Sequence, residues 1–390
     1  MPGAIYSPFA DRIQDGGAMS PAPPVPLHVG DTWRDPFVGA RSEDLRSEDH
    51  PRLHAYTDTR GLPELIEAVG EKLAARNGLT HSADEILITA GATGGLSAVA
   101  GAVLSPGDEM LILAPFWPLI RGIAQSFRAI PIEVPFFDRV SSAAAAVRAV
   151  ESRITSKSRV IYVSTPSNPT GRVIPRDWLE ALAALARRHD LWIFSDEVYE
   201  DYYYGIGSGP RDGSGVSGAV DKHESIAQFA PERTVSVYSF SKSYAMAGQR
   251  VGYLAGPAHL IANARKIGTH IYYHPPVVGQ RTALAALREG EKWLEAAYAQ
   301  DRDVGREVSA ILGERQPQGG TFLFLDVSDH LDDRGLSGLL EDCFEAGVLV
   351  APGPSCGADY GEWVRISYTA APAADVLSAA RRLARVLGRA

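Results

Sequence analysis

Residues 238–252, YSFSKSYAMAGQRVG, place one lysine, Lys242, between two serines, directly after a β-type run at 234–238. An arginine, Arg250, follows eight residues after the lysine. A surface lysine needs no such neighbours. A lysine that bonds to a phosphate-bearing ligand does need serine and arginine neighbours, because hydroxyl and guanidinium groups bind phosphate oxygens. The stretch therefore indicates a strand end that binds a phosphorylated molecule.

The composition is that of an ordinary globular protein. The 390 residues, 45% apolar and 22% charged, suit two domains. A net charge of −9 argues against a general nucleic-acid or membrane-surface binder. Two cysteines make neither a disulfide framework nor a metal site, so no metal is expected. The start has no secretory signal pattern, and no apolar run is long enough to span a membrane. We expect a soluble, cytoplasmic protein.

Short apolar runs alternate with amphipathic helical stretches through the middle of the chain. Helices are predicted at 63–78, which begins at a proline and ends at a glycine, and at 176–189. The predicted strands are 85–89, 109–113, 159–164, 191–195 and 234–238. Unbroken apolar strands between helices are typical of a largely parallel sheet covered on both faces. The sequence therefore predicts an α/β fold.

The pattern changes toward the C-terminus, where a smaller α+β domain is expected. Its predicted elements are a long charged helix at 291–312, strands at 319–327 and 363–368, and helices at 336–346 and the terminus. We therefore expect three parts: an N-terminal arm that joins the small domain at 1–49, a large domain at 50–288 and a small domain at 289–390. A glycine-rich stretch at 205–218 indicates a flexible loop.

In open α/β sheets, ligands collect beyond the carboxyl ends of the strands. The first strand is followed by a glycine-rich turn, Gly91-Ala92-Thr93, that opens a helix and suits a phosphate, although a tight turn alone also explains it. Trp117 follows the second strand and is equally compatible with simple packing. Asn168 follows the third between two prolines, which fix its amide in a turn.

The fourth strand ends in a carboxylate. Asp196 is costly at the end of a buried strand unless a cation pairs with it; the alternative is that it caps a helix. Tyr199, three residues further on, could share its ligand. The fifth strand leads into Lys242, the lysine of the opening stretch.

Together these strand ends match pyridoxal 5′-phosphate. A lysine amine forms a Schiff base with its aldehyde. A carboxylate keeps the pyridine nitrogen protonated, so that the ring accepts electrons from a carbanion. Hydroxyls, backbone amides and an arginine bind the phosphate, and an aromatic side chain stacks on the ring. The sequence therefore predicts pyridoxal 5′-phosphate as the cofactor.

The stretch 239–252 resembles the lysine signature of the class I/II aminotransferases, the fold-type I pyridoxal-phosphate enzymes that include aspartate aminotransferase. The lysine, two serines and the arginine all fall in register, and the similarity runs from about residue 25 to the C-terminus. The resemblance implies an enzyme that moves the amino group of an L-α-amino acid to a 2-oxo acid. It also implies a homodimer with shared active sites.

The resemblance implies a role for each residue of the cofactor site. Lys242 would carry the cofactor as a Schiff base and shuttle the proton. Asp196 would pair with the pyridine nitrogen, and Asn168 and Tyr199 would face the 3-oxygen. Trp117 would stack on the ring. The implied phosphate ligands are Ser239, Ser241, Arg250 and the turn Gly91-Ala92-Thr93.

The same resemblance implies contacts to the substrate and to a second subunit. Arg365, in WVRISY, would bind the substrate α-carboxylate, with Gly30 as a backbone contact and Asn168 beside it; a surface salt bridge is the alternative for Arg365. Tyr56, in HAYTDTRGLPEL, would reach the phosphate of the neighbouring subunit.

Residues near the substrate depart from the family pattern. Trp33 and Arg34 in GDTWRDP stand where the family often has a short Gly-Asp-Pro turn, and we expect Trp33 to contact the substrate. Arg34, the one added cation there, slightly favours an acidic or strongly polar side chain. Trp33 and the pair Tyr272–Tyr273 would favour an aromatic or long polar one almost as well.

Two other functions remain open at this point. A lyase or cyclase could use the same fold and cofactor, because a stabilised carbanion can react in several ways. A transcription regulator built on the same fold would need an added DNA-binding domain. Only about 25 residues precede the resemblance and the isoelectric point is acidic, so the sequence favours an enzyme without nucleic-acid partners.

Overall fold

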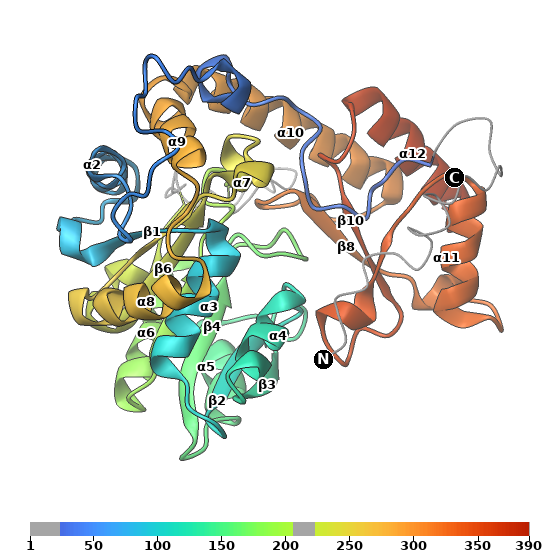
Figure 1. Ribbon diagram of the computed structural model, residues 1–390. Coiled ribbons are helices and arrows are strands. Elements are labelled where there is room, and N and C mark those ends of the chain that lie inside the picture. Colours follow the sequence, from blue (N-terminus) through green and yellow to red (C-terminus); the bar gives the residue numbers. More distant parts are fainter. Residues whose placement is uncertain (1–23, 206–222, 390) are drawn as a thin grey trace, which may run out of the picture.

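The computed structural model describes residues 24–205 and 223–389 (Figure 1). A large mixed sheet with helices on both faces makes up one part, and a small antiparallel sheet with its own helices makes up the other. Apart from Gly205, the predicted glycine-rich loop lies outside the described residues, as do the first 23 residues of the predicted arm.

The large sheet has the strand order β1-β7-β6-β5-β4-β2-β3. Only β7 runs antiparallel to its neighbours. Its strands are β1 (Ile86–Thr89), β2 (Glu109–Ala114), β3 (Ile130–Pro135), β4 (Ser158–Ser164), β5 (Trp192–Asp196), β6 (Thr234–Ser239) and β7 (Gly252–Ala255). All five strands expected from the sequence are present, and the predicted α/β fold is confirmed.

Helices bury both faces of this sheet. Successive residues of a strand point to opposite faces. In β2, Met110 and Ile112 pack in the core that includes Leu96 of one helix, whereas Leu111 and Leu113 pack in the core on the opposite face. This two-sided burial explains why the strands are unbroken apolar runs. The helices are α2 (Pro63–Lys72), α3 (Gly91–Val103), α4 (Leu119–Ser126), α5 (Ala143–Glu151), α6 (Arg176–Arg188), α7 (Phe240–Ser243), α8 (Ala258–Ile271) and α9 (Val277–Glu289).

The C-terminal part contains an antiparallel sheet of order β8-β10-β9. Its elements are α10 (Glu291–Leu312), β8 (Phe322–Asp326), α11 (Gly335–Glu345), β9 (Ala351–Pro352), β10 (Trp363–Ser367) and α12 (Ala373–Val386). The N-terminal segment joins this part, because Val25 bridges Val348 and the Ser367 N–H donates to the Leu27 carbonyl at 2.6 Å (Figure 1). The exact boundaries of the predicted domains stay a prediction.

Three strands were not expected from the sequence: β3, β7 and the two-residue β9. β3 contains Pro131 and Pro135, which an edge strand tolerates because one side of it needs no partner. β7 is only four residues long and follows the lysine signature directly. The first predicted helix ends at Gly78 as expected, because this glycine has φ +65°, and its last turn after Lys72 is π-helical.

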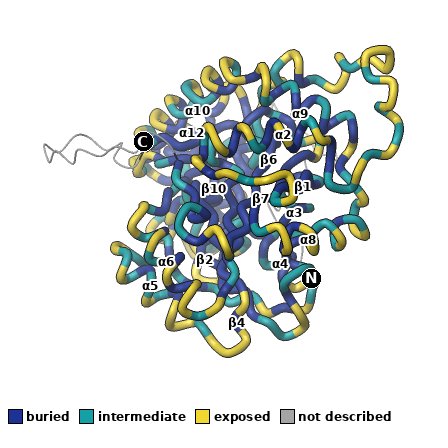
Figure 2. The backbone as a smooth tube through the Cα atoms, turned by 90° about the vertical axis from the view of Figure 1, so that its left-hand side faces the viewer, coloured by how far each residue is buried: buried dark blue, intermediate teal, exposed yellow. Residues whose placement is uncertain are grey.

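Buried residues follow the strands and the inner faces of the helices, and exposed residues lie on the outer turns (Figure 2). Every residue of β2 and β6 is buried. Within residues 24–205 and 223–389, no helix is long and apolar enough to cross a membrane.

Candidate active site

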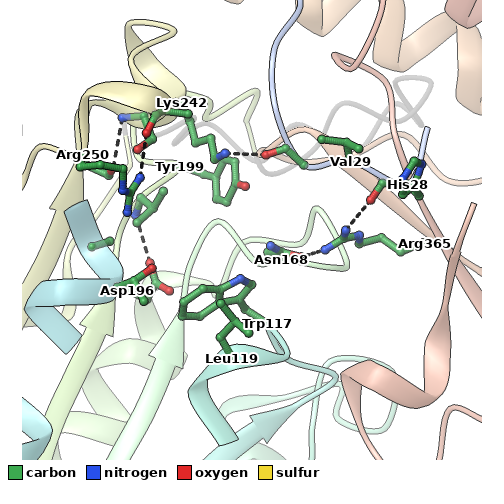
Figure 3. A pocket seen from close by; sticks show the side chains of 17 residues that line it. His28, Val29, Trp117, Leu119, Asn168, Asp196, Tyr199, Lys242, Arg250 and Arg365 are labelled. Carbon is green, nitrogen blue, oxygen red and sulfur yellow. Dashed lines mark hydrogen bonds between the residues drawn. The ribbon is translucent and has the colours of Figure 1, made fainter. Parts of the chain in front are cut away.

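A cavity of about 550 Å³ lies at the carboxyl ends of the parallel strands, beside β10 of the small sheet (Figure 3). Most of the residues singled out in the sequence line it. They are Gly30, Ala92, Thr93, Trp117, Asn168, Asp196, Tyr199, Ser239, Ser241, Lys242, Arg250 and Arg365. Segments far apart in the chain thus meet where open α/β sheets bind their ligands.

Lys242 lies on α7, the short helix that begins directly after β6. The Ser239 side chain caps this helix by accepting a hydrogen bond from the Ser241 N–H at 3.1 Å. Lys242 Nζ donates to the Gly30 carbonyl and lies 3.9 Å from Asp31 Oδ1. Burial lowers the pKa of Lys242, and the Asp31 carboxylate partly opposes this. A lowered pKa leaves more of the amine neutral and able to act as a nucleophile or base.

Asp196 ends β5 and faces the cavity with only 7% of its surface exposed. Its oxygens accept hydrogen bonds from the Tyr162 hydroxyl at 2.5 Å and the Val198 N–H at 3.3 Å, both of them neutral donors. Burial raises the pKa of Asp196 to about 6. No helix follows within residues 197–205, so the helix-cap alternative is wrong.

Arg365 reaches from β10 of the small sheet to the large one. It is 2% exposed, which excludes the surface salt bridge considered from the sequence. Its Nη1 donates to Asn168 Oδ1 at 3.0 Å and its Nη2 to the His28 carbonyl at 2.9 Å (Figure 3). The guanidinium also lies 4.5 Å from the centre of the Phe322 ring. These contacts fix a planar cationic fork at one end of the cavity.

The opposite end of the cavity is suited to an anion. Gly91 opens α3 with φ +67°, and a Cβ at this position would lie 2.5 Å from Arg250 Nη2. Only glycine therefore lets the guanidinium approach the helix N-terminus so closely. The Ser239 and Ser241 side chains line the same cavity. Helix dipole, guanidinium and hydroxyls together bind phosphate well.

Aromatic side chains form the walls between these two ends. Trp117 lines the cavity and also packs against the core on one face of the sheet, and its stacking on a cofactor ring stays a prediction. The Tyr199 ring is buried and meets the Phe322 ring edge-on, 5.7 Å between centres. Burial raises the pKa of Tyr199, so its hydroxyl stays protonated at neutral pH.

A comparison with protein families places this site in a known context. Residues 24–383, nearly the whole chain, match the family described as aminotransferase class I and II. The chain belongs to the class I and II aminotransferase family.

Known aminotransferases resemble this one at moderate identity. The aspartate/prephenate aminotransferase of Thermus thermophilus is 34% identical over 352 residues, covering 86% of this chain and 84% of the relative. An arginine–pyruvate transaminase of Pseudomonas aeruginosa is 34% identical, covering 82% and 81%. A solved structure of Thermus thermophilus aspartate aminotransferase with maleate superimposes with a TM-score of 0.84 at 29% identity, covering 99% of this chain and 97% of that one. The predicted fold-type I architecture and aminotransferase activity are thereby confirmed.

Three predicted site residues of this aminotransferase are not among those that line the cavity, and one of them, Gly91, lies against Arg250. Tyr56 is 80% exposed, and its ring meets those of Tyr273 and His274 at 5.1 and 5.7 Å between centres. Trp33 is 44% exposed and is not among the lining residues. Neither contact to a ligand is made within this chain, and their roles stay predictions.

Besides Val198 and Ala247, which also line the cavity, four residues at the aminotransferase site were not expected from the sequence. Tyr162, whose hydroxyl donates to Asp196, is the one aromatic residue of β4, and a ring with a polar tip within the apolar run 160–163 was a usable signal. His28 and Val29 reach the cavity from the N-terminal segment, and Leu119 lies at the start of α4. No local pattern marks these three.

Proposed function

We propose that this aminotransferase holds pyridoxal 5′-phosphate in the cavity and transfers the amino group of an L-α-amino acid to a 2-oxo acid, with Lys242 as the proton carrier. The observation that carries the proposal is the placement of three charged functions around one cavity: the carboxylate of Asp196, the amine of Lys242 and the guanidinium of Arg365.

The lining residues fit this cofactor. The anion-binding end at Gly91 and Arg250 suits the phosphate. Asp196 is a buried carboxylate with neutral hydrogen-bond donors, and a protonated ring nitrogen would give it the cation that burial demands. Trp117 offers a face for stacking. A cavity of about 550 Å³ also lies within the usual range for cofactor sites.

The bound cofactor supplies the electron sink that stabilises a carbanion at the substrate Cα. The chain's own residues orient the substrate. Arg365 and Asn168 hold its α-carboxylate, because the guanidinium fork matches two carboxylate oxygens. In the same cavity, Lys242 Nζ donates a hydrogen bond to the Gly30 carbonyl, which holds the amine in position. Lys242 would take the proton from the substrate Cα and later return it, and its lowered pKa would keep more of the amine in the neutral form that accepts a proton.

We also propose that the enzyme is a homodimer in which Tyr56 contacts the phosphate of the partner subunit. The support is an exposed set of large apolar side chains that a monomer would leave in water: Val38, Tyr56, Ile271 and Tyr273, between 47% and 80% exposed.

The test is the half-reaction of the purified holoenzyme with a panel of amino acids and no oxo acid. Transamination should convert the cofactor stoichiometrically to its pyridoxamine form and release a 2-oxo acid. A lyase or cyclase would regenerate the original cofactor spectrum while product accumulates over many turnovers. That second result would replace the proposed transamination by the elimination alternative.

A further inference from the structure

We propose that Tyr162 is a positioning residue for the reaction: its hydroxyl holds the Asp196 carboxylate ionised and oriented, so that the carboxylate leaves the proton on the cofactor ring nitrogen. The inference rests on the proposed function, because it takes Asp196 as the partner of that nitrogen. Tyr162 is not among the residues that line the cavity, so it acts through Asp196.

Tyr162 reaches Asp196 because their strands are neighbours in the large sheet. β4 and β5 pair in parallel, with Ser164 opposite Asp196. Tyr162 lies two residues before Ser164, and side chains two residues apart on a strand point to the same face of the sheet. The Tyr162 ring packs in the core that also contains Phe194 of β5, and its hydroxyl donates to Asp196 Oδ2 at 2.5 Å.

The two oxygens of the Asp196 carboxylate have separate donors. Oδ2 accepts from Tyr162, and Oδ1 accepts from the Val198 N–H at 3.3 Å. Donors on both oxygens fix the plane of the carboxylate, which the bond from Val198 alone would not do. Tyr162 is 0% exposed within this chain, so neither water nor a second subunit reaches its hydroxyl. The orientation of Asp196 therefore depends on Tyr162.

The hydroxyl also acts on the charge of Asp196. Burial raises the pKa of Asp196 to about 6, although the hydrogen bonds from Tyr162 and Val198 oppose the rise. Burial raises the pKa of the Tyr162 hydroxyl well above its usual value, so the hydroxyl stays a donor at neutral pH. A carboxylate with a higher proton affinity would compete with the ring nitrogen for its proton. Tyr162 therefore favours a charged carboxylate beside a protonated nitrogen.

Other ionisable groups surround Asp196 and have to be separated from it. Glu197, the next residue, raises the Asp196 pKa through its negative charge, and it lies 3.3 Å from His223 Nε2. Tyr199 and Lys242 line the same cavity as Asp196. A comparison of each protein with its Asp196→Asn counterpart isolates the titration of Asp196 from that of these groups.

The first measurement uses the cofactor-free protein. Urea midpoints are measured from pH 4 to pH 9, at one protein concentration, for the wild type, Tyr162→Phe, Asp196→Asn and the double variant. Because the pKa of Asp196 is raised in the folded state, the wild type should lose stability relative to Asp196→Asn as the pH rises, until about pH 6. In the Tyr162→Phe pair the loss should continue about one pH unit further. A loss that ends at the same pH in both pairs overturns the inference.

The second measurement is the single-turnover half-reaction of the four holoenzymes with an amino acid that the wild type converts. Tyr162→Phe should slow the reaction about tenfold, and it should slow Asp196→Asn no further, because the group through which it acts is gone. An unchanged rate in Tyr162→Phe would show that the reaction does not need the hydroxyl. Equal slowing in both backgrounds would show a purely structural role. Either result overturns the inference.

Tyr360→Phe is the matched control. Tyr360 is also buried, and its hydroxyl donates to Asp138 Oδ1 at 2.8 Å; neither residue lines the cavity. This variant should change neither the pH at which the loss ends nor the half-reaction rate. Changes as large as those of Tyr162→Phe would assign both effects to lost packing and overturn the inference.

Failure of the proposed function gives a different result. If the wild type converts its cofactor with no amino acid, the proposed function fails and the role of Tyr162 in the reaction falls with it. The pH dependence of the cofactor-free proteins would still decide whether Tyr162 acts on Asp196.

Discussion

Replacing Asp196 by asparagine should make the cofactor-free protein more stable and the loaded enzyme much slower. The carboxylate is 7% exposed, and burial raises its pKa from 3.8 to about 6. An acid whose pKa is raised in the folded state binds protons more tightly there than in the unfolded chain. Stability is therefore lost as the pH rises from about 4 through about 6, and the loss persists above that range.

The size of the effect follows from the pKa shift. The rise of the Asp196 pKa from 3.8 to about 6 corresponds to about 3 kcal/mol of lost stability above pH 7, and to roughly half of that at pH 5. Asparagine keeps one oxygen to accept from Tyr162 or Val198 and loses the other acceptor, which costs about 1 kcal/mol. The Asp196→Asn apoenzyme should thus be about 2 kcal/mol more stable than the wild type at pH 8, with a smaller advantage at pH 5.

Urea denaturation of both apoenzymes at pH 5 and pH 8 measures this difference, and the exposed Asp329→Asn serves as the control. In the loaded enzyme the same substitution should slow the half-reaction more than ~100-fold, because the ring nitrogen loses the group that keeps it protonated. An equal stability of the two apoenzymes at pH 8 would refute the buried-charge reasoning. A wild-type half-reaction rate would show that Asp196 does not face the ring.

Three further predictions concern the other site residues. Lys242→Ala should abolish turnover yet retain the cofactor through gel filtration, since the phosphate and ring contacts come from other side chains; a cofactor-free eluate would contradict this. Arg365→Lys keeps the charge but loses the fork, so kcat/KM should fall by a similar factor, about 10- to 100-fold, for every substrate; a loss confined to some substrates would instead assign Arg365 to side-chain recognition. Mixed Tyr56→Ala and Lys242→Ala subunits should regain partial activity, because one site of each hybrid dimer is intact; no recovery, with hybrids shown by native mass spectrometry, would argue against shared sites.

Structural features that are determined by residues close together in the sequence could be predicted. The five strands are recognisable because each is an apolar run between turns, and burial on both faces of one sheet requires such runs. Asp196, Asn168 and Lys242 are recognisable because each stands at the end of such a strand, where parallel topology brings ligand-binding side chains to one edge.

Structural features that depend on contacts between residues far apart in the sequence could not be predicted. Arg34 looked like a free cation, but it pairs with Asp301, which lies 267 residues away. His28 reaches the cavity because the N-terminal segment lies along β10, as its carbonyl contact with Arg365 shows. β3 was missed because its prolines disfavour a strand in general, although an edge position accommodates them.

The proposed role of Lys242 as the carrier of the cofactor in this aminotransferase has a direct test. Borohydride reduction of the loaded enzyme, followed by proteolysis and mass spectrometry, fixes the cofactor covalently to whichever amine holds it. We predict a single modified peptide, with the added mass on Lys242. A modification on another lysine, or no modification of a loaded enzyme, would contradict it.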